Sequence, residues 1–146
     1  MRTRYFALAV GIIYLLVGLA GFVLTDEREI VGLDVDNGEG DLLGLFPVNV
    51  LHNLVHIAIG LLGILAYRSF DFARNYSRAL AIVYALLAVM GLIDAGNLNN
   101  TFGLIPIYSH DIWLHAVTAA IAAYFGFGPV EAGESYADQG GARRTV

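Results

Sequence analysis

The chain has 146 residues, of which 58% are hydrophobic and 14% are charged, with a net charge of −5 and a mean hydropathy of +0.66. This is the composition of a membrane protein, and it excludes an ordinary soluble domain. Cysteine is absent, which excludes disulfides, thiolate metal sites and thiol redox chemistry. No glycine-rich phosphate loop, nucleophile elbow or basic patch for nucleic acid is visible.

Four apolar segments follow one another along the chain, and charged residues bound each of them. We expect one domain, residues 1–130, with transmembrane helices at about 5–25, 47–67, 77–97 and 110–128. The third helix is long enough only if Asp94 lies inside the protein. Residues 131–146 are polar and rich in glycine, and we expect a disordered cytoplasmic tail. The sequence therefore predicts an all-α, integral membrane four-helix bundle.

The arginines predict how this bundle is oriented in the cell membrane. They precede the first expected helix, separate the second from the third, and recur in the tail, whereas residues 26–41 are strongly acidic. By the positive-inside rule, both termini are cytoplasmic and the acidic loop is outside. The expected surroundings are the lipid bilayer, and the small size of the bundle leaves open a homo-oligomer or a partner in a membrane complex.

The chain also contains an internal repeat. Residues 44–56 align with residues 103–115 at an offset of 59, with glycine, leucine, proline and histidine in common. The preceding segments align at an offset of 70, which places Tyr14 over Tyr84. We predict two tandem helical hairpins, related by a pseudo-twofold axis along the membrane normal.

Polar residues interrupt the second and fourth expected helices at matching positions. His52 and His56 are four residues apart, as are Asp111 and His115, and this spacing lets two side chains of one helix bind one metal ion. Helical periodicity places the polar residues of each helix in one stripe. From their polarity and the repeat, we expect both stripes to face the bundle interior and each other. Three imidazoles and one carboxylate suit zinc, iron, manganese or copper.

Three further polar residues are candidates to orient the imidazole N–H groups of such a site. They lie beside the four expected ligands or at the outer end of the third expected helix: Asn49, Asn53 and Asp94.

Other interpretations of these residues are open. The polar side chains can hydrogen-bond across helices and only lock their packing, as in a non-enzymatic structural or accessory subunit. They can also handle protons or small ions. Haem ligated by His56 and His115 fits less well, because two axial histidines do not need the second polar pair. No catalytic residue is identified, and we expect a binding or structural protein rather than an enzyme.

A proline followed by N-x-x-H-N-x-x-H, with D-x-x-x-H near the end of the chain, resembles the small prokaryotic four-helix membrane proteins known as domain of unknown function 4383. The resemblance extends from Arg4 to about Gly128. It implies the same four-helix fold and importance for the motif positions: Asn49, His52, Asn53, His56, Asp111 and His115. It implies no activity.

Overall fold

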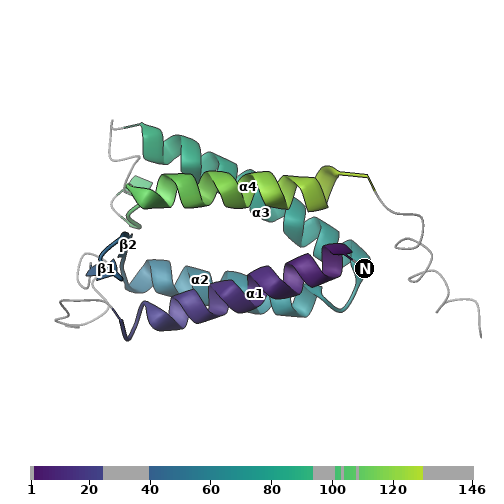
Figure 1. Ribbon diagram of the computed structural model, residues 1–146, viewed down its shortest axis with the longest axis horizontal. Coiled ribbons are helices and arrows are strands. Elements are labelled where there is room, and N and C mark those ends of the chain that lie inside the picture. The colour runs from purple at the N-terminus through teal and green to yellow at the C-terminus, as the bar shows by residue number, and fades with distance from the viewer. Residues whose placement is uncertain (1, 25–39, 94–100, 103, 108, 130–146) are drawn as a thin grey trace, which may run out of the picture.

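The computed structural model describes residues 2–24, 40–93, 101–102, 104–107 and 109–129. Most of them lie in four helices, which confirms the predicted all-α class (Figure 1). A short antiparallel hairpin, which the sequence analysis did not predict, precedes the second helix. The elements are α1 (Arg2–Ala20), β1 (Gly40–Leu42), β2 (Phe46–Val48), α2 (Val50–Ala66), α3 (Phe70–Leu92) and α4 (His110–Phe127).

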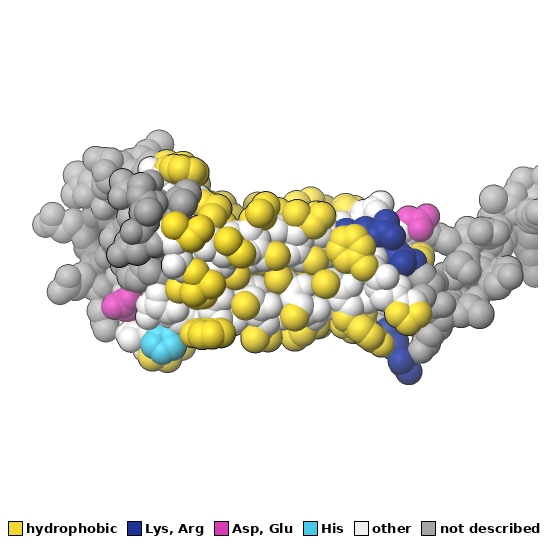
Figure 2. Space-filling view, turned by 90° about the horizontal axis from the view of Figure 1, so that it is seen from above, with side chains coloured by type: hydrophobic (Ala, Val, Ile, Leu, Met, Phe, Trp, Pro, Cys, Tyr) yellow, Lys and Arg dark blue, Asp and Glu magenta, His cyan; other side chains and the backbone are white. Residues whose placement is uncertain are grey.

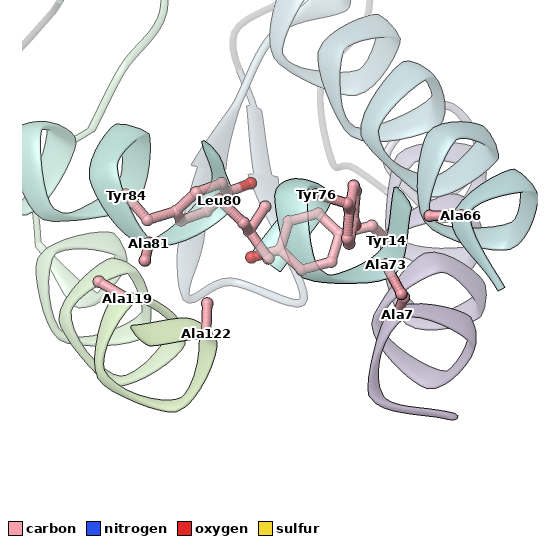
Figure 3. Packing of buried hydrophobic residues seen from close by; sticks show 10 residues of the cluster. All are labelled: Ala7, Tyr14, Ala66, Ala73, Tyr76, Leu80, Ala81, Tyr84, Ala119 and Ala122. Carbon is pink, nitrogen blue, oxygen red and sulfur yellow. The ribbon is translucent and has the colours of Figure 1, made fainter. Parts of the chain in front are cut away.

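The helices form two closely packed pairs, α1 with α2 and α3 with α4 (Figure 1). Small residues allow the backbones of each pair to approach. A Cβ atom added to Gly60 would lie 2.5 Å from the Leu15 backbone nitrogen and 2.8 Å from the Gly11 carbonyl oxygen. In the second pair, Ala119 and Ala122 are buried against α3 (Figure 3). Each pair is therefore a helical hairpin with no room for large side chains at its contact.

Larger side chains fill the space between the two helix pairs. Tyr76, Leu80 and Tyr84 extend from α3 into this space, and Tyr14 extends into it from α1 (Figure 3). The rings of Tyr14 and Tyr84 meet edge to face, with centroids 5.5 Å apart. The core thus has two kinds of contact. Small residues form the contacts within each helix pair, and large, mostly aromatic side chains form the contact between the pairs.

Several predicted helix boundaries are wrong. The third helix begins at Phe70 instead of about residue 77, because the Ser69 hydroxyl accepts a hydrogen bond from the Phe72 N–H at 3.1 Å and caps the helix start. It is described only as far as Leu92. The first helix, expected at 5–25, runs from Arg2 to Ala20. The fourth, expected at about 110–128, runs from His110 to Phe127.

The second helix was expected to start at Pro47, and this too is wrong. Pro47 lies in β2, opposite Asp41, and Asn49 is the residue that caps the helix. Pro106 likewise precedes the start of α4 at His110. Proline lacks a backbone N–H, so it fits the edge strand of a hairpin as well as the first turn of a helix.

The outer surface of the helices is apolar. Figure 2 shows hydrophobic side chains covering the middle of the molecule, with arginines gathered near one end. By length and composition, α1 and α3 are able to cross a membrane, and α2 is an apolar helix of 17 residues. Asp94, most of the acidic loop and the tail lie outside the described residues.

Candidate functional site

Asn49 fixes the N-terminal end of α2, and both the oxygen and the nitrogen of its side-chain amide form hydrogen bonds. Its Oδ1 accepts a hydrogen bond from the His52 backbone N–H at 2.8 Å, and its Nδ2 donates to the Leu104 carbonyl at 2.7 Å. The first bond caps α2, and the second ties α2 to the segment that precedes α4. The sequence analysis proposed that Asn49 orients the imidazole N–H groups, and it did not identify Asn49 as the cap of α2.

The first turns of α2 carry a buried polar stripe. His52, Asn53 and His56 follow Asn49 at helical spacing, and all three are buried. The imidazole rings of His52 and His56 stack on each other, with centroids 4.5 Å apart and an angle of 26° between the planes. As predicted, the stripe faces the interior of the bundle.

The matching stripe on α4 is also buried. Asp111 lies in the first turn and is 3% exposed, and His115 is one turn further and 2% exposed. The His115 ring meets Tyr84 of α3 edge to face at 5.0 Å. Both stripes therefore point into the core, each from its own helix pair.

A continuous row of rings joins the two stripes across the molecule. The His56 ring contacts Tyr14 at 5.0 Å, Tyr14 contacts Tyr84, and Tyr84 contacts His115. The Tyr14 hydroxyl also donates to the Thr118 hydroxyl, at 3.4 Å. Each stripe belongs to a different helix pair, because α2 packs mainly on α1, and α4 mainly on α3. That the two stripes face each other stays a prediction, and Tyr14 and Tyr84 supply the ring contacts that connect them.

Five buried polar atoms of this region have no hydrogen-bond partner in the described part of the chain. Buried polar atoms are paired in the great majority of cases, so five together at one site are unusual. Three are imidazole nitrogens and two are oxygens that accept hydrogen bonds or bind cations: His52 Nδ1, Asn53 Oδ1, His56 Nδ1, Asp111 Oδ2 and His115 Nδ1.

These side chains do not form a ready-made metal site. Within the described residues, no three histidine, aspartate or glutamate side chains converge as metal ligands. Metal binding by His52, His56, Asp111 and His115 therefore stays a prediction. It requires the side chains to rotate toward one another, and Asp94 cannot be placed because it lies outside the described residues.

Arginines close the other end of both helix pairs. Arg4 at the start of α1 donates from Nε to the Tyr67 carbonyl at 2.6 Å, and Arg74 near the start of α3 donates from Nε to the Gly126 carbonyl at 3.0 Å. Each bond satisfies a carbonyl at the C-terminal end of the partner helix, where a positive charge is also favoured. The sequence analysis used these arginines only to orient the chain.

The comparisons with known proteins agree with this fold but add no activity. No curated protein and no solved structure matches the chain. One family model, described as a domain of unknown function, matches residues 4–128, from the first arginine that closes a helix end to the last described turn of α4. This match covers most of the chain, so the protein belongs to the family named domain of unknown function 4383.

Proposed function

We propose that this chain is an integral membrane protein whose two helix pairs enclose a binding site for a transition-metal ion. The ligands are the polar cluster, defined as His52, His56, Asp111 and His115. Asn53, which is buried beside His52 on α2, would orient the imidazoles. The ion would serve as a Lewis acid or redox centre in the outer half of the bilayer.

The membrane position is supported by the distribution of side chains. The exposed positions of all four helices are largely apolar, for example Leu16, Leu86 and Val117, and the arginines gather near one end. The shortest of the four helices, α2, has 17 residues. At about 1.5 Å per residue, its length approaches the ~30 Å thickness of the hydrocarbon core of a bilayer. The arginine-rich end would be cytoplasmic.

A pseudo-twofold relation between the helix pairs is supported by contacts that recur at the offsets of 70 and 59. The ring centroids of Tyr14 and His56 are 5.0 Å apart, and those of Tyr84 and His115 are also 5.0 Å apart. The arginine bonds to Tyr67 and Gly126 obey the same offsets. Buried positions of α1 also recur in α3: Thr3 and Ala73, Ala7 and Ser77, Gly11 and Ala81, Tyr14 and Tyr84, and Gly18 and Ala88.

Ligand binding explains the unpaired atoms better than a purely structural role. Side chains that only lock helices together should hydrogen-bond to one another, yet Asp111 Oδ2 and three imidazole nitrogens lack partners in the described residues. An unpaired carboxylate is costly inside a membrane, and a bound cation would offset that cost. This group of unpaired atoms is the observation that carries the proposal.

Elemental analysis of the full chain, purified in mild detergent without chelators, tests the proposal. We expect about one equivalent of zinc, iron, manganese or copper per chain, since imidazole and carboxylate ligands bind these ions. His56→Ala and His115→Ala should each remove most of it. His110→Ala is the matched control, because His110 is exposed at the start of α4 and belongs to neither stripe.

Two results would contradict the metal proposal. One is wild-type protein that holds no metal even after incubation with each of the four ions. The other is metal that His110→Ala removes as effectively as His56→Ala does. In either case the structural interpretation, in which the cluster only locks helix packing, would become the better account.

A further inference from the structure

A cavity of about 290 Å³ lies between α1 and α4, beside the row of rings. Its outer wall is formed by apolar side chains that face away from the core, among them Ile13 and Ile121, which are 56% and 47% exposed. Its inner wall contains Tyr14, His56 and Thr118. The cavity thus combines an apolar mouth with three polar side chains at its base, the usual composition of a small-molecule site.

The repeat explains why this side of the bundle is open. The offsets that relate the two helix pairs place Phe6 over Tyr76 and Val10 over Leu80. Tyr76 and Leu80 are buried between α2 and α3, where the Tyr76 hydroxyl donates to the Ile59 carbonyl at 3.3 Å. The smaller Phe6 and Val10 instead line the cavity. The same space is therefore filled on one side of the molecule and left open on the other.

The polar side chains at the base can donate hydrogen bonds. The Thr118 hydroxyl accepts the bond from Tyr14, so its own proton is available to another acceptor. His56 lines the cavity and is 7% exposed, so part of its imidazole ring is accessible from it. In the repeat, Ile59 takes the place of Thr118, so the filled side has no hydroxyl at this position. A neutral imidazole and a hydroxyl together suit a carbonyl oxygen.

We propose that this cavity binds a membrane quinone, a flat and neutral lipid that carries carbonyl groups on its ring. A charged ligand does not fit, because the mouth is apolar and the arginines lie at one end of the helices. A plain acyl chain would offer no acceptor to the Thr118 proton or to the His56 ring, whereas a quinone carbonyl would. Ring contacts with Tyr14 add to the binding of a quinone. The proposal does not depend on a metal in the polar cluster.

Photolabelling of the full chain in phosphatidylcholine nanodiscs with a short-tailed azidoquinone tests this inference. We expect labelled peptides from α1 and α4, and competition by the unlabelled quinone. The double variant Val10→Leu and Thr118→Ile introduces the residues that the repeat carries at Leu80 and Ile59. It should weaken binding at least about tenfold, because it fills the cavity and removes the hydroxyl.

Val55→Leu is the matched control, since it adds the same methylene to an exposed position on α2. It should leave labelling unchanged, and thermal unfolding should show that every variant is folded. Labelling that the double variant does not weaken would overturn the proposal, as would competition by decane as strong as that by the quinone. Metal content measured on the same samples keeps the two proposals apart, since the double variant leaves all four cluster residues in place.

Discussion

At the scale of single residues, the Asn49 side chain makes two hydrogen bonds at the start of α2. Asn49→Ala removes the cap of α2 and leaves the Leu104 carbonyl without its donor. We expect a loss of about 2 kcal/mol in the free energy of unfolding, since the lost cap and the unpaired carbonyl each cost about 1 kcal/mol. Unfolding by SDS in mixed micelles would measure it.

Ser69→Ala is the comparison for that variant. Ser69 also caps a helix, but its bond to the Phe72 N–H is exposed, so its removal should cost about half as much or less. Equal losses for the two variants would show that the bond from Asn49 to Leu104 contributes nothing to stability.

The residues of the polar cluster could be identified from the sequence, because their spacing on an apolar background is informative. His52, His56, Asp111 and His115 are all buried, as their periodicity predicted. The role of Asn49 as a cap could not be inferred in the same way. The cap is the residue before the first residue of α2, and the sequence predicted that α2 begins at Pro47 rather than at Val50. The ring contacts of Tyr14 and Tyr84 with the histidines depend on which helices pack together. The sequence of one helix alone does not determine that pairing.

At the scale of elements, the pairing of α1 with α2 depends on a close backbone contact at Gly60. Gly60→Ala places a Cβ atom 2.5 Å from the Leu15 nitrogen, so the helices must separate. We expect a loss of about 1–3 kcal/mol, as for other overpacked contacts. Val89→Ile, which adds one carbon to an exposed position, should change stability by less than about 0.5 kcal/mol. A neutral Gly60→Ala would contradict the packing described for this pair.

The number and type of helices could be predicted from apolar segments, but their ends could not. The third helix was expected to start at about residue 77, in the basic stretch that contains Arg74 and Arg78, because charges were expected outside the membrane. In the structure both arginines lie within the helix and donate to the Gly126 carbonyl. A long basic side chain can therefore belong to a spanning helix and still reach its end. The capping residue Ser69 was the signal that marks the start.

At the scale of the whole molecule, two similar helix pairs meet through unlike surfaces. The α2–α3 side is filled by Tyr76 and Leu80, and the α1–α4 side is open at the cavity. Under the two proposals, one half of the repeat would stabilise the bundle and the other half would bind a ligand. The sequence predicted that the halves are similar, but the difference between Tyr76 and Phe6, or Leu80 and Val10, gains a structural meaning only when the helices are placed side by side.

The most direct test of the central claim is whether metal binding stabilises the folded bundle through the polar cluster. Thermal unfolding would be measured after chelation, and again with zinc, iron(II), manganese or copper(II) added. Ligand linkage predicts a gain of about 2.7 kcal/mol for the wild type at a hundredfold excess over the dissociation constant, and no gain for the double variant His56→Ala and His115→Ala. An equal gain in both proteins, or no gain with any of the four ions, would contradict the account.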